Sequence, residues 1–204
     1  VNLMGKIGVI DYGCGNLASL TYALKRLRAY PIVSNQISDL EKCDRFILPG
    51  VGAFPYAMKQ LIELGIVDFL KDKAKNKYPI LGICLGMQLL FEKSDEFGGS
   101  DGIGILKGHV EKLPNIFPTI PNIGWWELNV DNSDPFLNIS HEDTFYFVHS
   151  FQCVPDSPDI QLNLAFEKAK VCALVSHNSV TAVQFHPEKS QKSGEKILRH
   201  FIKH

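Results

Sequence analysis

The sequence predicts an α/β fold with a mostly parallel central sheet flanked by helices, and three observations indicate it. In the first half of the chain, short β-branched runs alternate with amphipathic helical segments, as in βαβ units. Glycine-rich turns follow some of these runs. After about residue 98 the pattern changes to short strands and turns, which we interpret as antiparallel additions to one edge of the sheet. We expect one domain over residues 1–204.

Each element is expected from its periodicity and its flanking residues. In the first half, strands are expected at residues 6–11, 30–34, 43–50 and 78–84. Helices are expected at residues 17–28, 57–76 and 86–92, and Gly65 should interrupt the second of them. In the second half, strands are expected within residues 104–113, 143–151, 170–178 and 180–185, before a closing helix at residues 194–203.

Composition excludes several classes of function. The net charge of −1 provides no basic surface for nucleic acid or for an anionic membrane. No segment reaches the roughly 18 unbroken apolar residues of a membrane span, and the first residues lack the zones of a signal peptide. The five cysteines are widely spaced and form no CxxC pair, which argues against a disulfide framework or a metal site. We therefore expect a cytoplasmic protein with no metal and no cofactor.

One cysteine stands in an unusual setting. Cys84 follows an expected strand and precedes an expected helix, with Gly82 and Gly86 two residues to either side. This is the G-x-nucleophile-x-G elbow, in which glycines let the strand and helix pack closely. The positive end of a helix favours a thiolate, and the N–H of Leu85 could stabilise an oxyanion. A small packing residue in a tight turn would explain the same pattern, so a base is needed to decide.

A base is available further along the chain. His186 lies where an expected strand ends at Pro187, so its imidazole can project beyond the sheet edge. Glu188 could accept a hydrogen bond from one ring nitrogen while the other takes the thiol proton. Alone, these residues could be a solvated loop. With the cysteine elbow, they favour a Cys84–His186–Glu188 triad.

At this point the chain resembles a known family. Residues 79–92, "PILGICLGMQLLFE", and residues 185–190, "FHPEKS", resemble the class I (triad) glutamine amidotransferases, whose domain is flavodoxin-like. Within that family the resemblance extends to the glutaminase subunits of imidazole glycerol phosphate synthase. It is carried by the segments "IDYGCGNLASL", "ILPGVGAF", "IPNIGW", "YFVHSF" and "QFHPEKS".

The resemblance implies a role for each matching position. Cys84 would attack the side-chain amide of glutamine, His186 would transfer protons, and Glu188 would orient the imidazole. The implied oxyanion hole comprises Val51 and Leu85, with Gly50 and Gly52 permitting a backbone rearrangement. Substrate contacts are implied for Gln88, His149, Ser150 and Phe151.

The resemblance also implies a partner. Ammonia released from glutamine would pass to a (βα)8-barrel cyclase subunit in a heterodimer that serves histidine biosynthesis. Interface residues are implied at Asn16, Trp125, Tyr146 and Lys189. Where the family usually reads Pro-His-Met-Gly-Trp-Asn, this chain has Asn122, Ile123 and Trp126 at the three substituted positions. We expect these three positions on the partner-facing surface.

Alternatives remain open at this stage. The substitutions leave room for a related glutaminase that feeds ammonia to another synthase, such as a surface-sugar amidation system. A standalone cysteine hydrolase would use the same elbow, and its hydrolysis would be fast without a partner. A catalytically inactive binding module would be expected to have lost the cysteine.

Overall fold

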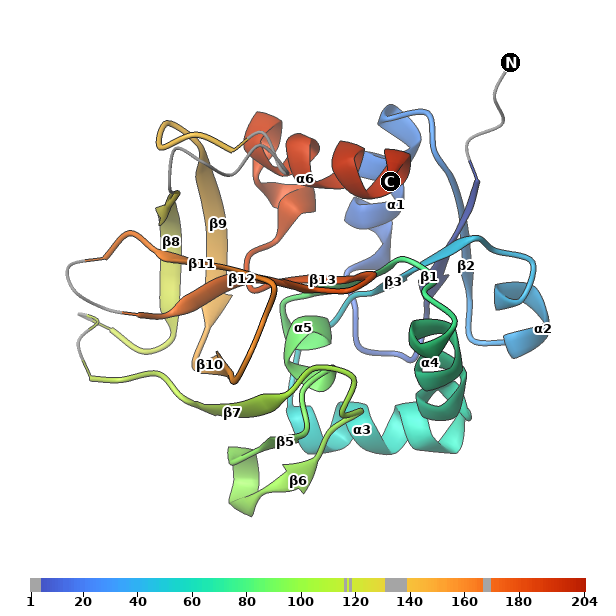
Figure 1. Ribbon diagram of the computed structural model, residues 1–204, viewed down its shortest axis with the longest axis horizontal. Coiled ribbons are helices and arrows are strands. Elements are labelled where there is room, and N and C mark those ends of the chain that lie inside the picture. The colour runs from blue at the N-terminus through green and yellow to red at the C-terminus, as the bar shows by residue number, and fades with distance from the viewer. Residues whose placement is uncertain (1–4, 116, 118, 131–138, 167–169) are drawn as a thin grey trace.

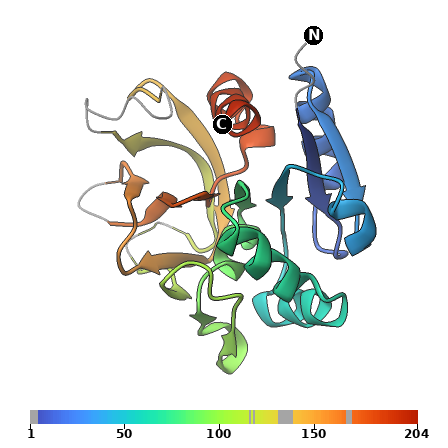
Figure 2. The ribbon, with the colours of Figure 1, turned by 45° about the vertical axis from the view of Figure 1, so that its right-hand side comes forward.

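The computed structural model describes residues 5–115, 117, 119–130, 139–166 and 170–204. Within them, nine strands form one sheet in the order β2-β1-β3-β4-β13-β12-β11-β8-β9 (Figure 1). From β2 to β13 neighbouring strands are parallel, and from β13 to β9 they are antiparallel. Figure 2 shows the parallel strands of the first half, in blue, on one side and the antiparallel strands, in yellow to orange, on the other. The α/β fold class is therefore confirmed.

The elements have the following bounds. The parallel strands are β1 (Lys6–Ile10), β2 (Tyr30–Ser34), β3 (Arg45–Leu48), β4 (Ile80–Ile83) and β13 (Val180–Val183). The antiparallel strands are β8 (Asn122–Asn129), β9 (Thr144–His149), β11 (Ile160–Leu164) and β12 (Cys172–His177). The helices are α1 (Leu17–Arg26), α2 (Ile37–Leu40), α3 (Phe54–Glu63), α4 (Ile66–Lys75), α5 (Leu85–Leu89) and α6 (Gln191–Lys203). Two 3-10 turns are η1 (Glu96–Gly98) and η2 (Pro187–Lys189).

Two apolar cores lie on the two faces of the sheet. Figure 1 shows α1 and α6 on one face and α3, α4 and α5 on the other. Leucines of α1 and α6 pack with Ile47 of β3 in one core, whereas Phe46 and Leu48 enter the other core together with α3 and α4. Side chains along β3 therefore alternate between two buried layers, as expected for a parallel strand covered on both faces.

Most expected elements are present, with two differences. The long helical segment is interrupted at Gly65 as expected, where φ is 69°. The expected helix at residues 86–92 is shorter and comprises only α5. The strand within residues 104–113 is not at the edge of the main sheet, which corrects that expectation. It is β7 (Gly108–Lys112), which belongs to a four-stranded sheet with β10 (Phe151–Pro155), β5 (Lys93–Ser94) and β6 (Ser100–Asp101).

The physical reason for the second sheet lies in β7 and β10. The chain leaves the main sheet between β9 and β10, and β10 then pairs antiparallel with β7. Gly108 makes this pairing possible, because a Cβ at this position would lie 2.1 Å from the carbonyl oxygen of Val154. Sequence periodicity reports that a segment is a strand but not which strand it pairs with, so this sheet was not foreseen.

Candidate active site

The nucleophile candidate stands at a strained turn between β4 and α5. Cys84 has φ 55° and ψ −112°, a backbone conformation that non-glycine residues rarely adopt. Both flanking glycines are required by close packing. A Cβ on Gly86 would lie 1.8 Å from the carbonyl oxygen of Leu48, and one on Gly82 would lie 2.7 Å from the Leu90 side chain. The turn therefore holds the thiol at the carboxyl end of the sheet.

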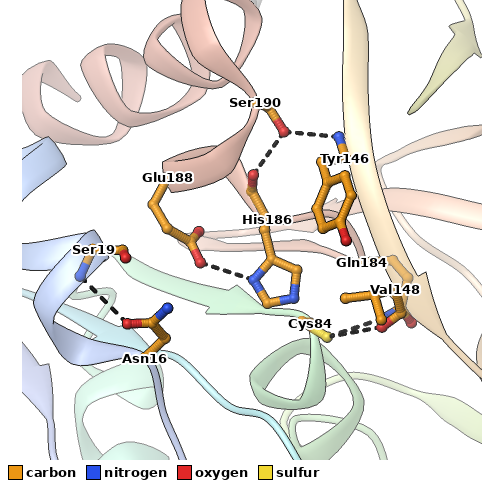
Figure 3. A network of polar contacts seen from close by, with 9 residues as sticks. All are labelled: Asn16, Ser19, Cys84, Tyr146, Val148, Gln184, His186, Glu188 and Ser190. Atoms are coloured by element: carbon orange, nitrogen blue, oxygen red, sulfur yellow. Dashed lines mark hydrogen bonds and ion pairs between the residues drawn. The ribbon is translucent and has the colours of Figure 1, made fainter. Parts of the chain in front are cut away.

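The imidazole of His186 lies between a carboxylate and this thiol (Figure 3). Its Nδ1 is 2.8 Å from Glu188 Oε1, and the two side chains are only 3% and 4% exposed. The backbone of His186 is fixed as well, since its N–H donates to the Tyr146 carbonyl and its carbonyl accepts from Ser190 Oγ. The structure thus brings Cys84, His186 and Glu188 together from two distant segments.

The environment of His186 favours its charged form. Burial alone would lower its pKa, but the neighbouring Cys84 and Glu188 together outweigh burial and raise the pKa to about 9. The Nδ1–H donates to Glu188, so the Nε2 position is the one that can exchange a proton with the thiol. Nε2 makes no hydrogen bond within the described part of the chain.

The two expected oxyanion donors are engaged in other hydrogen bonds. The Val51 N–H donates to the Cys14 carbonyl at 2.8 Å, and the Leu85 N–H donates to the Gly50 carbonyl at 3.3 Å. The Gly50 carbonyl thus occupies the acceptor position beside the Leu85 N–H. Gly52, at φ 109°, has open space around its Cα. The open space at Gly52 permits a change in the backbone at this residue.

A cleft of about 270 Å³ opens beside the thiol. It contains most of the residues expected to bind glutamine or its oxyanion. They are Val51, Gly52, Leu85, Gln88, His149, Ser150 and Phe151, together with Cys84 itself. Such a volume suits a small polar molecule held by a few polar groups.

Sequence reasoning missed two residues of this site. Glu96 lines the cleft, and its Oε2 accepts a hydrogen bond from the Phe54 N–H at 2.7 Å. Gln184 is completely buried, and its Nε2 donates to Cys84 Sγ at 3.7 Å. A glutamine between strand β13 and His186, next to the buried Phe185, was a detectable signal. Glu96 offered none, because an acidic residue in a turn is ordinary.

His149 is buried and held as a neutral ring. Burial is the main cause that lowers its pKa to about 4. Its Nδ1–H donates to the Phe151 carbonyl at 2.8 Å, and Nε2 accepts from Asn122 Nδ2 at 3.1 Å. Asn122 in turn accepts from the indole N–H of Trp126 at 3.0 Å. These bonds join β8 to the segment that lines the cleft.

This arrangement corrects the expectation for the three substituted positions. Asn122 is 3% exposed and Trp126 packs against the core, so neither lies on a partner-facing surface. Ile123, at 58% exposed, is open to solvent. The reason is the alternation of β8, whose successive side chains point to opposite sides.

The residues with an implied interface role form a partly exposed group. Trp125 is 46% exposed, and its ring centroid lies 5.7 Å from that of Tyr146. Lys189 Nζ lies 5.7 Å from the Tyr146 ring centroid, so the three side chains are contiguous. Asn16 is separate from this contact. It begins α1, and its side-chain oxygen accepts from the Ser19 N–H at 3.5 Å (Figure 3).

Comparison with known proteins decides the family. Residues 8–204 match the family "Glutamine amidotransferase class-I". The chain belongs to the class-I glutamine amidotransferases. A 46% identical relative from Prochlorococcus marinus, called "Imidazole glycerol phosphate synthase subunit HisH", aligns over 96% of this chain and 93% of its own length. A relative of the same name from Lactococcus lactis is 40% identical over 98% of both chains.

A solved structure agrees on the fold. The structure titled "Crystal structure of glutamine amidotransferase" superposes with a TM-score of 0.76 at 22% identity, covering 96% of each chain. In the described residues of this amidotransferase, no cluster of side chains suited to a metal ion occurs, and no helix could cross a membrane.

Proposed function

We propose that this amidotransferase is the glutaminase subunit of an imidazole glycerol phosphate synthase. The observation that carries the proposal is the convergence of Cys84, His186 and Glu188 beside a small cleft. Near full-length identity of 40–46% to proteins called imidazole glycerol phosphate synthase subunit supports the choice within the family.

The chemistry follows from the positions of the three side chains. With the proton of the Cys84–His186 pair held on His186 Nε2, Sγ attacks the side-chain carbonyl carbon of glutamine. The imidazolium then protonates the amide nitrogen, the C–N bond breaks, and ammonia leaves behind a γ-glutamyl thioester. A water molecule, deprotonated by His186, attacks the thioester and releases glutamate and the thiol. Glu188 keeps the ring oriented and stabilises its charge.

The oxyanion of the tetrahedral intermediate requires a change in the backbone. Rotation of the Gly50–Val51 peptide would remove the Gly50 carbonyl from Leu85 and turn the Val51 N–H toward the substrate. The Val51–Cys14 hydrogen bond opposes this rotation, and Gly52, which has open space around it, permits it. From this resting geometry we expect low glutaminase activity in the absence of a partner.

The cleft offers matching groups for the rest of the substrate. Both N–H groups of Gln88 are used by the protein, which leaves its carbonyl oxygen to accept from the substrate amide. Glu96 can pair with the α-ammonium group of glutamine. Residues 149–151 line the cleft and present backbone groups to the α-carboxylate.

We propose that the ammonia passes to a (βα)8-barrel cyclase subunit, bound through Trp125, Tyr146, Lys189 and Asn16. Lys189 directly follows Glu188, so a partner that holds Lys189 also affects the triad. The related function in surface-sugar amidation rested on the substituted segment, and the burial of Asn122 and the partial burial of Trp126 weaken it. We propose a cytoplasmic location, which the five free cysteines support.

One reconstitution tests the proposal. The purified chain is mixed in turn with a histidine-pathway cyclase and with a surface-sugar synthase, and glutamate release and acceptor amination are measured. We expect stimulated glutamine hydrolysis and imidazole glycerol phosphate with the cyclase alone. Stimulation by the sugar synthase alone would contradict the choice of partner. Rapid hydrolysis without any partner would indicate a standalone hydrolase.

A further inference from the structure

The buried glutamine before the triad histidine has no role in the steps above. Gln184 lies in the segment after β13, is completely buried, and touches Cys84 rather than the cleft (Figure 3). Burying a primary amide is unfavourable unless its polar atoms are hydrogen-bonded, and both ends of this amide are. The question is which end faces the sulfur.

The hydrogen-bond network determines that orientation. The Phe151 carbonyl can only accept, so the atom of Gln88 that faces it at 3.3 Å is the NH2 group. The same NH2 group lies 3.0 Å from the Gln184 side chain, which must therefore present its oxygen there. The Gln184 NH2 group is left for Cys84 Sγ, at 3.7 Å.

A second chain of bonds reaches the same carbonyl and agrees with this assignment. The indole N–H of Trp126 can only donate, so Asn122 presents its oxygen to it and its NH2 group to His149. The ring of His149 then donates from Nδ1 to the Phe151 carbonyl. Every amide and ring in the network is oriented consistently, with donors directed at Phe151 from both sides.

We propose that Gln184 is a positioning residue that stabilises the Cys84 thiolate by a fixed N–H donor. The proposal rests on the proposed function only for the use of that thiolate in turnover. The other hydrogen bond of the sulfur, to the Val148 carbonyl at 3.9 Å, needs a thiol proton and cannot serve the thiolate. Gln184 retains its bond when the proton leaves, and the bond strengthens because its acceptor becomes charged.

Other titratable groups lie near the sulfur and interact with it. His186 faces it after β13, Tyr12 faces it after β1, and Cys153 on β10 lies close enough to interact. His149 at the end of β9 interacts with His186. A test must change the Gln184 donor while leaving these groups in place.

Alkylation of Cys84 by iodoacetamide across pH, followed by mass spectrometry of the Cys84 peptide, isolates the effect. It uses the full chain without glutamine. In Gln184→Met, which keeps the length of the side chain but has no N–H, we expect the midpoint of the profile to rise by about one pH unit, a tenfold smaller thiolate fraction. Gln152→Met is the matched control, because Gln152 is also buried but bonds to Glu111. Its midpoint should stay unchanged.

Gln184→Glu separates the effect of the N–H donor from the effect of side-chain packing. This variant keeps the shape of the side chain and can still accept from Gln88, and at a pH where its buried carboxyl is ionised it offers no donor to the sulfur. There we expect a midpoint at least as high as in Gln184→Met, and a melting temperature below that of the parent because the charge is buried. A Glu variant that alkylates like the parent would overturn the proposal and assign Gln184 a packing role. If Gln184→Met fails to fold, the Glu variant decides alone.

The readout also separates this proposal from the proposed function. A shifted alkylation midpoint in a protein that never hydrolyses glutamine would retain the role of Gln184 and reject the glutaminase. If the parent chain hydrolyses glutamine normally and the midpoint is unshifted in both variants, the glutaminase is retained and the role of Gln184 is rejected.

Discussion

The two sides of Cys84 differ in how complete they are. On one side, which we call the triad side, the side chains of Gln184, His186 and Glu188 are buried and already directed at the sulfur or at one another. On the other, the oxyanion side, the N–H groups of Val51 and Leu85 are bonded within the protein. The triad side is therefore preorganised in this structure, whereas the proposed oxyanion hole, which would stabilise the tetrahedral intermediate, is not. We infer that turnover is limited by the backbone at residues 50–52.

Loss of the nucleophile tests the triad side most severely. Cys84→Ala should lower glutamine hydrolysis by about 10⁴-fold or more, because Cys84 is the only cysteine among the described residues that line the cleft. Synthesis from added ammonium salt by the complex with its cyclase should stay near the parental rate, measured as formation of the cyclase product. Loss of both activities together would contradict the division of work between the two subunits.

Removal of one backbone N–H tests the oxyanion side. Val51→Pro deletes the donor, and we expect glutaminase turnover of the complex to fall by about 10²- to 10³-fold. Val51→Ala keeps the N–H and is the matched control, since the Val51 side chain is 43% exposed. Both variants should alkylate at Cys84 like the parent. Equal turnover in the two variants would remove Val51 from the oxyanion hole.

The pH dependence sharpens the description of the triad side. With a pKa of about 9, His186 keeps its proton at neutral pH and loses it as the pH rises. Because this proton is needed by the departing nitrogen, glutaminase turnover should decrease about tenfold per pH unit above pH 9. Glu188→Gln removes the carboxylate that helps to raise this pKa, so its decrease should begin at lower pH. If turnover decreases over the same alkaline pH range in the parent and in Glu188→Gln, a group other than His186 causes the decrease.

Substitution of the surface residue Lys189 tests whether the partner stimulates the site through the triad side of Cys84. Lys189→Ala should lower the stimulation of glutaminase by the cyclase by about tenfold, the effect typical of one coupled charge at an interface. Lys75→Ala on α4 provides a control at an exposed position away from the triad. Circular dichroism should show both variants folded. An unchanged stimulation ratio would exclude Lys189 from the interface.

The sequence predicts the two sides of Cys84 unequally well. Strand–helix alternation and the pair Gly82 and Gly86 predict the elbow, because close packing permits only glycine there. The short segment from His186 to Glu188 predicts the base, because two side chains only two residues apart have few possible positions relative to one another. The direction of the Val51 N–H cannot be predicted in the same way, since a peptide can rotate between two orientations without any change in sequence.

Long-range contacts account for what was missed elsewhere. The inward side of β8, which carries Asn122 and Trp126, depends on register with β9 rather than on any local pattern. Glu96 reaches the cleft only because η1 lies beside the N-terminus of α3. Both depend on tertiary placement, which one sequence does not reveal.

The most direct test of the central claim is to trap the acyl intermediate. The complex is mixed with glutamine, quenched with acid within the first turnovers and digested, and the Cys84 peptide is analysed by mass spectrometry. We expect a γ-glutamyl adduct on Cys84 that appears before glutamate accumulates and is absent in a His186→Ala variant. Release of glutamate with no adduct on Cys84 in the parent, or turnover that persists without His186, would contradict the account.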